Sequence, residues 1–318
     1  MKIDPHVHCR DGKQSYKETI AHVFAVADAQ GVQKIFDMPN TDPPITAEKD
    51  IDERLKLVPS ERINDYYVWI GVTSDAGQLE GAVKCYENRK NVIGLKMFAG
   101  KSVGDLTVLE KEDQKKVYKT LANLGYKGVI AVHCEKESLI KGEIWDPKNP
   151  LTHSKSRPKR AEIKSVKDQI ELAKKAGFLG TLHICHITCP ESVELVDLAR
   201  KEISVTCGVT PHHALWDQKM QKRPDGLLYK MNPPLRDKKT VAGLLECVKN
   251  GKIDWIETDY APHQVGEKMF PPYMSGYPSL CLYKDFVENF LPSLGVSQEL
   301  IEKMTYGNIA RVFESKLK

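Results

Sequence analysis

The sequence predicts an α/β protein whose parallel strands close into a (β/α)8 TIM barrel. Eight short runs of β-branched, aromatic and other apolar residues recur along the chain, and amphipathic helical stretches lie between them. Strands that alternate with helices are typical of parallel sheets, and eight such units suggest a closed barrel. An open doubly wound sheet is the alternative, but no glycine-rich phosphate loop follows the first run, which favours the barrel.

The elements are predicted in order along the chain. The short apolar runs are the expected strands, namely Lys2–His6, Lys34–Met38, Tyr66–Gly71, Val92–Phe98, Gly128–His133, Gly180–Ile187, Ile203–Val209 and Ile253–Thr258. The amphipathic stretches are the expected helices, namely Tyr16–Gln30, Ala47–Leu57, Gln78–Asn88, Lys111–Leu124, Ala161–Ala176, Glu191–Arg200 and Lys238–Asn250. Gly31, Gly125 and Gly177 follow three of these helices, where helices commonly end.

Length and composition are those of an ordinary globular protein. The chain has 318 residues, of which 41% are hydrophobic and 28% charged, and this excludes collagen, a coiled coil and wholesale disorder. No proline-, glycine- or serine-rich linker divides it. We expect residues 1–318 to form a single barrel domain, with two or three C-terminal helices over about residues 279–318, around Pro292 and Gly295.

Charge and cysteine usage restrict the partners and the compartment. The net charge is +4, and the basic residues are mostly interleaved with acidic ones, so a nucleic-acid footprint is not indicated. The N-terminus is polar from Asp4 onward, and no apolar run approaches the length of a membrane span. The eight cysteines form no Cys-x-x-Cys pair, which favours reduced thiols. We expect a soluble, cytoplasmic protein without nucleic-acid or membrane partners.

A metal site is indicated by polar residues at the ends of the predicted strands. His6 and His8 are two apart where the first strand ends, so both imidazoles face the same side and can bind one divalent cation. Taken alone, they are equally compatible with a pair of surface histidines. Four further strands end in polar residues, namely Lys96, His133, His186 and Asp259. Because the carboxyl ends of barrel strands converge on one mouth, we expect these six side chains to meet there.

Neighbouring residues are expected to lie outside this site. His183 and His186 are three apart, so on a strand they face opposite sides, and we assign His186 to the site because it is nearer the strand end. Cys134 and Cys185 adjoin two of the histidines, and their thiols are candidate soft metal ligands. Neighbours on a strand point to opposite faces, however, so we expect both thiols to point away and pack. His212 and His213 follow the seventh strand and are expected in a loop behind the site.

Lys96 suggests a particular metal chemistry. A protonated amine repels a divalent cation, whereas carbamylation by CO₂ makes the side chain an anion that bridges two metal ions. A hydroxide held between two metals is a strong nucleophile at neutral pH. Asp259 could then bind one metal and carry a proton to the leaving group. This combination is typical of hydrolases that act on amide-like bonds.

At these residues the sequence resembles the amidohydrolase superfamily of metal-dependent barrels, and within it the dihydroorotase family. The matching segments run in family order from residue 4 to about residue 280, which is nearly the whole chain. They are Asp4–Arg10, Met38–Pro44, Gly94–Met97, Val132–Glu135, His183–Thr188, Val209–His213, Met231–Arg236 and Thr258–His263.

The resemblance implies two Zn²⁺ ions per chain, bridged by a hydroxide and by carbamylated Lys96. The other matched ligands divide between the two ions, with His6, His8 and Asp259 on the first and His133 and His186 on the second. The residues that match substrate contacts are Arg10 and Asn40, which hold a carboxylate, together with Asn232, His263, Ser275 and Gly276.

The implied reaction is the reversible, zinc-dependent cyclisation of N-carbamoyl-L-aspartate to L-dihydroorotate and water, a step of pyrimidine biosynthesis. The hydroxide is the nucleophile and Asp259 is the proton shuttle. Both molecules carry a carboxylate that does not react, and the planar fork of Arg10 suits that group. Related cyclic amidohydrolases of the hydantoinase, dihydropyrimidinase or allantoinase type act on substrates without this carboxylate, so Arg10 favours the first interpretation.

Some features depart from the family pattern. The flanking segments that form a small β-sandwich in longer relatives are missing, so we expect a barrel without that subdomain. Tyr260 stands where the longer relatives usually have histidine, and Cys281 where glutamate is frequent.

An inactive barrel that serves as an assembly partner is a further alternative for the function. The sequence also leaves open whether the protein forms a homodimer. Residues 99–106 are either a lid over the site or a plain surface loop.

Overall fold

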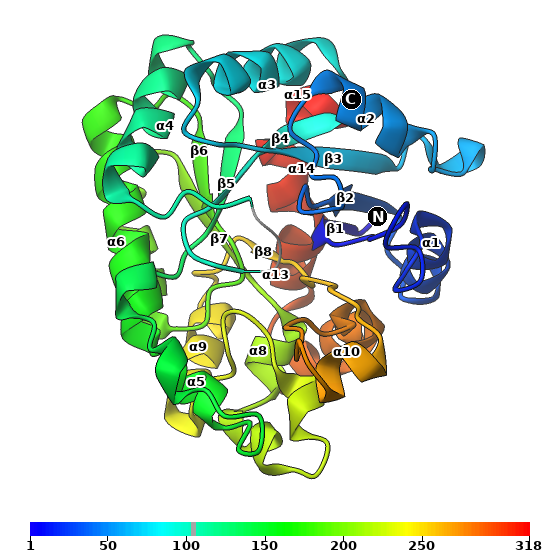
Figure 1. Cartoon of the computed structure of the whole chain (residues 1–318), viewed down its shortest axis with the longest axis vertical. Helices are drawn as coiled ribbons and strands as arrows, with labels where there is room; N and C mark the ends of the chain where they lie inside the picture. Colours follow the sequence, from blue (N-terminus) through cyan, green and yellow to red (C-terminus); the bar gives the residue numbers. More distant parts are fainter. Residues whose placement is uncertain (103–105) are drawn as a thin grey trace.

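The eight predicted strands form one parallel sheet in sequence order (Figure 1). The computed structural model describes residues 1–102 and 106–318. The strands are β1 Ile3–Val7, β2 Lys34–Asp37, β3 Tyr66–Gly71, β4 Val92–Phe98, β5 Val129–His133, β6 Thr181–Ile184, β7 Val205–Val209 and β8 Trp255–Ile256. A parallel bridge between Val7 and Tyr260, with the His8 amide donating to the Tyr260 carbonyl at 2.7 Å, brings the two sheet edges together. The predicted α/β barrel is confirmed.

Helices cover the outside of the barrel at the predicted places. They are α1 Ile20–Ala29, α2 Glu48–Leu55, α3 Ala76–Asn88, α4 Lys111–Asn123, α6 Lys159–Ala176, α7 Pro190–Ala199 and α9 Lys238–Lys249. Gly177 ends α6 in the left-handed conformation (φ 64°) that favours glycine. The first helix starts four residues later than predicted, because the Thr19 side chain accepts the His22 amide and caps it.

Two strands are shorter than predicted, at their carboxyl ends. The prediction extended β6 to Ile187 and β8 to Thr258, but they stop at Ile184 and Ile256. His186 and Asp259 lie just beyond, with φ of 37° and 49°, which no regular strand accommodates. The chain therefore leaves the sheet just before it supplies these two site residues.

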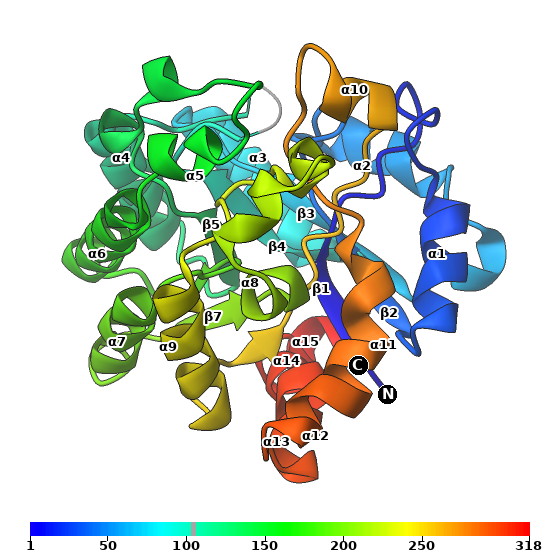
Figure 2. The ribbon, with the colours of Figure 1, turned by 90° about the horizontal axis from the view of Figure 1, so that it is seen from below.

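Short helices that periodicity did not predict lie around the mouth of the barrel. They are α5 Thr152–Ser156, α8 Pro211–Leu215 and α10 Val265–Met269. Figure 2 shows α5 and α10 at the end of the barrel opposite the two chain termini. Each has five residues, too few for a helical period to be visible in the sequence.

The C-terminal region closes the opposite end. A helical segment built from α11 Tyr283–Asp285, the π-helical turn Phe286–Phe290 and α12 Leu291–Ser293 stops before Gly295. A second combines α13 Gln298–Glu302, the turn Lys303–Gly307 and α14 Asn308–Val312, and α15 Glu314–Leu317 follows. Pro292 lies within the first segment, whereas Gly295 (φ 80°) ends it.

Phe313 seals the amino-terminal end of the barrel. Its ring lies 5.2 Å from Phe36, 5.8 Å from Trp69 and 5.9 Å from Trp255, measured between centroids. All four side chains are buried. Apolar packing thus fills this end, and the polar strand ends are left to the other. Within the described part of the chain, no helix has the length and apolar character needed to cross a membrane.

Candidate metal centre and substrate pocket

A polar cavity opens at the carboxyl ends of the strands. It has about 360 Å³ of empty space, and every predicted site residue lines it except Lys96 and His263. The lining residues are His6, His8, Arg10, Asn40, Phe98, Ser102, His133, His186, Asn232, Asp259, Ala261, Ser275 and Gly276. The tertiary structure thus brings together ten residues that the sequence distributes over 270 positions.

The first predicted cluster converges on a point near Asp259. Its Oδ1 lies 2.9 Å from His8 Nε2 and 3.4 Å from His6 Nε2, and one ligand atom from each of the three residues lies within 4.8 Å of the others. His8 Nδ1 lies 2.8 Å from Asn40 Oδ1, so Asn40 holds the ring in the orientation that brings Nε2 to Asp259. Two imidazole nitrogens and a carboxylate oxygen are a ligand set that zinc accepts.

The second predicted cluster lies beside the first. His133 Nδ1 and His186 Nε2 are 3.1 Å apart, and the His186 ring is 5.2 Å from the His6 ring. Lys96 is fully buried below them on β4, with its Nζ 3.0 Å from Cys185 Sγ. The predicted bridging lysine therefore lies at the floor of the site instead of lining the cavity.

Several buried polar atoms around the cavity have no hydrogen-bond partner within the described residues. They are His6 Nδ1, His186 Nδ1 and Asn232 Oδ1. Buried polar atoms are almost always satisfied in native proteins, so a group of unsatisfied ones points to a ligand. The donor set and these atoms fit metal ions held by His6, His8, His133, His186 and Asp259.

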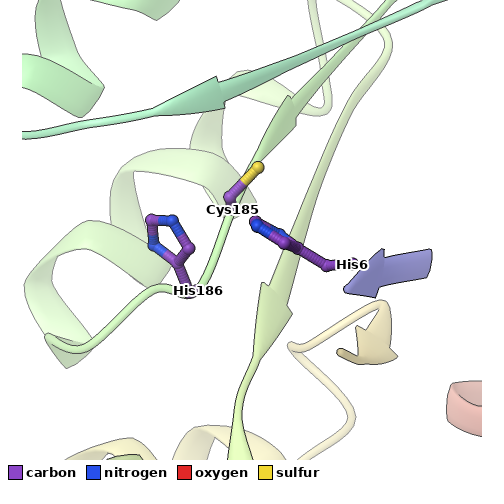
Figure 3. A group of neighbouring side chains, drawn as sticks. All are labelled: His6, Cys185 and His186. Atoms are coloured by element: carbon purple, nitrogen blue, oxygen red, sulfur yellow. The ribbon is translucent and has the colours of Figure 1, made fainter. Parts of the chain in front are cut away.

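Cys185 corrects one expectation. It was predicted to point away from the site, yet it projects toward His6 next to His186 (Figure 3). The prediction assumed that residues 185 and 186 alternate on a strand. However, β6 ends at Ile184, and the positive φ of His186 breaks the alternation.

Electrostatics in the site favour ionised carboxylates and neutral imidazoles at His8 and His186, whereas Cys185 and Glu257 outweigh burial at His6 and raise its pKa to about 9. Burial opposes ionisation of Asp259, but its contacts with His8 and His6 outweigh burial and hold its pKa well below the usual range. Burial lowers the pKa of His8 to about 4. Burial and the neighbouring His133 together lower the pKa of His186 strongly. Neutral imidazoles are the form in which histidine binds metals.

Two carboxylates that the sequence analysis did not select hold metal-ligand candidates in place. Glu257 accepts from His183 Nε2 at 3.0 Å and from the backbone amide of His186, and it lies 3.6 Å from His6 Nδ1. The sequence contains a signal that points to Glu257, because Glu257 and Asp259 are two residues apart, as His6 and His8 are. His183 does not line the cavity; it stacks on Trp255 with ring centroids 4.2 Å apart, and one of its ring nitrogens lies within 4.8 Å of Cys185 Sγ and a Glu257 oxygen.

Glu135 plays the same part for His133. Its Oε2 lies 3.2 Å from His133 Nε2, and Arg157 grips both carboxylate oxygens from the other side at 2.7–3.1 Å. Burial raises the pKa of Glu135, but the charge of Arg157 lowers it and holds it well below its usual range. A carboxylate behind a histidine fixes which nitrogen faces a metal.

The substrate side is dominated by Arg10. This guanidinium is 2% exposed and contacts the Pro262 carbonyl at 3.3 Å and His263 Nε2 at 3.2 Å. No carboxylate lies within 4.0 Å of it among the described residues. Burial lowers its pKa to about 10, so it stays charged at neutral pH and faces the cavity without a counter-ion.

His263 lies behind the cavity wall. Its Nδ1 lies 3.3 Å from Lys17 Nζ, and its Nε2 lies 3.2 Å from an Arg10 guanidinium nitrogen and 3.1 Å from the Ser275 carbonyl oxygen. Burial and the charges of Arg10 and Lys17 lower the pKa of His263 strongly. The assignment of His263 to the substrate stays a prediction; in this structure its imidazole contacts Arg10 and Ser275, which line the cavity.

The remaining expectations concern loops. The suggested lid, residues 99–106, falls partly on residues 103–105, which lie outside the described residues, although Ser102 lines the cavity. Tyr260, at the position of a usual histidine, donates to Glu18 at 2.6 Å and is buried away from the cavity. Cys281 is exposed.

Comparison with solved structures places the fold in a class. The L-hydantoinase (dihydropyrimidinase) from Arthrobacter aurescens superposes with a TM-score of 0.85 over 98% of this chain and 70% of that chain, at 23% sequence identity. The fold is therefore the α/β barrel found in cyclic amidohydrolases.

Sequence comparison identifies the family. The chain is 30% identical over 323 residues to a dihydroorotase from Methanosphaera stadtmanae, covering 98% of this chain and 70% of the relative. It is 32% identical over 278 residues to a dihydroorotase from Methanosarcina mazei, of which it spans only 58%. No protein-family model matches. The chain belongs to the dihydroorotase family.

Proposed function

We propose that the protein catalyses the reversible, zinc-dependent cyclisation of N-carbamoyl-L-aspartate to L-dihydroorotate and water. The observation that carries this proposal is the buried guanidinium of Arg10 beside the histidine and aspartate cluster, for which the described residues supply no carboxylate partner within 4.0 Å. A buried charge without a counter-ion is costly, and a substrate carboxylate supplies the missing partner. Membership of the dihydroorotase family supports the same substrate.

Two Zn²⁺ ions would be held by the clustered residues. His6, His8 and Asp259 would bind one ion, His133 and His186 the other, and carbamylated Lys96 would join them. Such ions, when bound, lower the pKa of water and polarise a carbonyl. Glu257 and Glu135 would keep His6 and His133 oriented toward the ions.

The protein's own groups account for orientation and proton transfer. Arg10 would anchor the unreactive carboxylate, so that the ring amide carbonyl faces the histidine cluster. In the hydrolytic direction the bond between this carbonyl carbon and the ring nitrogen breaks. Asp259 Oδ1 would take up the proton of the attacking water and deliver it to that nitrogen, and the reverse sequence would close the ring.

One purified sample tests the proposal. Zinc content and dihydroorotate hydrolysis are measured together, with hydantoin and dihydrouracil as substrates that lack the carboxylate. Two zinc ions per chain and turnover of dihydroorotate alone are expected. Turnover of a control substrate instead would assign the site to a hydantoinase- or dihydropyrimidinase-type reaction. No turnover after reconstitution with zinc and bicarbonate would favour an inactive assembly partner.

A further inference from the structure

Cys185 brings a thiol into the middle of the histidine cluster. Its Sγ, a ring nitrogen of His6 and a ring nitrogen of His186 all lie within 4.8 Å of one another. The three side chains are 1–3% exposed. In Figure 3 the imidazole of His6 reaches from β1 toward the thiol, and His186 approaches from the turn after β6.

The histidines of this group have unused capacity for a ligand. Within the described part of the structure, the buried Nδ1 atoms of His6 and His186 accept and donate no hydrogen bond. The thiol itself contacts the Lys96 amine at 3.0 Å. A buried sulfur beside two imidazole nitrogens is a donor set that thiophilic cations prefer.

We propose that His6, Cys185 and His186 form a binding site for one soft divalent cation, in which Cys185 is a thiolate ligand. Nitrogen and sulfur donors together select Zn²⁺, Cd²⁺ and similar ions over the hard, oxygen-preferring Mg²⁺ and Ca²⁺. Binding breaks the S–H bond and forms a metal–sulfur bond. The thiol proton leaves to solvent, and no electron is transferred.

This site competes with the proposed dinuclear centre. His6 and His186 belong to both arrangements, and the sulfur lies next to the amine from which a carbamate on Lys96 would extend. The thiolate arrangement needs no carbamate, so we expect it to form when CO₂ is absent. The cation site shares His6 and His186 with the proposed dinuclear centre, but it does not depend on the reaction proposed for that centre.

Cobalt titration of metal-free protein in CO₂-free buffer tests the site. Thiolate ligation of Co²⁺ produces a sulfur-to-metal charge-transfer absorption in the near ultraviolet, which imidazole and carboxylate ligands do not produce. We expect this band to saturate at one Co²⁺ per chain. We also expect Cys185→Ser to abolish it and to weaken Cd²⁺ binding at least roughly tenfold.

Cys134→Ser is the matched control. Cys134 is equally buried and also adjoins a histidine of the cluster, but it belongs to no candidate metal group among the described residues. The charge-transfer band of Cys134→Ser should have the same intensity as the band of the unaltered protein. Cys185→Ala, with its fold checked by circular dichroism, replaces the serine variant if that variant does not fold.

Two results would overturn the inference: absence of the band in the unaltered protein, or its persistence after Cys185 is replaced. Neither result bears on the proposed reaction. Dihydroorotate turnover is measured separately, with zinc and bicarbonate present.

Discussion

At the scale of single residues, the site concentrates unusual backbone conformations. Arg10, His186 and Asp259 all have φ between 37° and 53°. Non-glycine residues at positive φ are uncommon and cost of order 1–3 kcal/mol each when strained. Here the conformation turns each side chain into the cavity at the point where its strand ends. The fold thus tolerates local strain where the candidate chemistry is located.

Replacing Arg10 by Met should weaken substrate binding and leave the metal in place. A charge-assisted hydrogen bond contributes about 1.5–3 kcal/mol, so kcat/KM for dihydroorotate should fall about tenfold to a hundredfold. Steady-state kinetics and zinc analysis of the same sample measure both effects. Unaltered KM would contradict the assignment of Arg10 to the carboxylate.

Lys96→Ala should lose activity and one of the two bound zinc ions, because the variant cannot carry a carbamate, whereas the site of His6, Cys185 and His186 needs none. Acetate or propionate, as small carboxylic acids, should restore part of the turnover by occupying the vacated space. Metal analysis with and without the added acid provides the measurement. A variant that binds as much zinc as the parent would refute the bridging role.

At the scale of elements, two lysines hold the loop Tyr273–Gly276 against the cavity. Lys230 Nζ donates to the Tyr273 carbonyl at 2.7 Å and to Ser275 Oγ at 2.8 Å. Lys268, on α10, donates to the carbonyls of Lys230, Met274 and Gly276. Neither ammonium has an acidic partner within 4.0 Å among the described residues. Backbone carbonyls satisfy Lys268, and a backbone carbonyl together with the Ser275 hydroxyl satisfies Lys230.

Lys268→Met should loosen this loop without disturbing the metal ligands. Because Ser275 and Gly276 line the cavity, KM for dihydroorotate should rise, by roughly tenfold, while zinc content stays constant. Lys238→Met, an exposed substitution at the start of α9, is the control. An unchanged KM would mean that the loop keeps its position without the Lys268 contacts.

The same lysine should make stability depend on pH. Burial, reinforced by the charge of Lys230, lowers the pKa of Lys268 from 10.5 to about 7. Between these values the unfolded chain binds a proton that the folded chain has released, so the free energy of unfolding should rise with pH through this interval. Chemical denaturation at several pH values should show a slope of up to about 1.4 kcal/mol per pH unit that Lys268→Met removes. Equal slopes in both proteins would contradict this.

At the scale of the whole molecule, the two ends of the barrel have separate roles. Phe313 and its aromatic neighbours fill the amino-terminal end, and the cavity lies at the other. Stability and chemistry are therefore expected to respond to different substitutions, as is general for barrels of this type.

Phe313→Ala should destabilise the protein by about 3–5 kcal/mol, because a buried aromatic ring is replaced by a cavity. Phe270 is 67% exposed, so Phe270→Ala should change stability little and serves as the control. Urea denaturation measures both. Zinc content of folded Phe313→Ala should match the parent, and a loss of zinc there would show that the two ends are coupled.

Sequence patterns were sufficient for the elements and for most of the candidate cavity. Short apolar runs between amphipathic stretches placed all eight strands, since the strands of a parallel barrel are buried on both faces. Residues at strand ends, such as His6 and Asp259, were predictable because barrel strands converge at one mouth. The short helices α5, α8 and α10 were not, because five residues show no period.

What the sequence by itself determined is the barrel, the family and the set of polar side chains at its mouth. Only the tertiary structure decided that Cys185 enters the cluster, that His263 lies behind Arg10, and that Glu257 orients His6. The physical reason is the same in each case. These relations depend on where a strand stops and on contacts between residues far apart in the chain, and local periodicity carries no information about either.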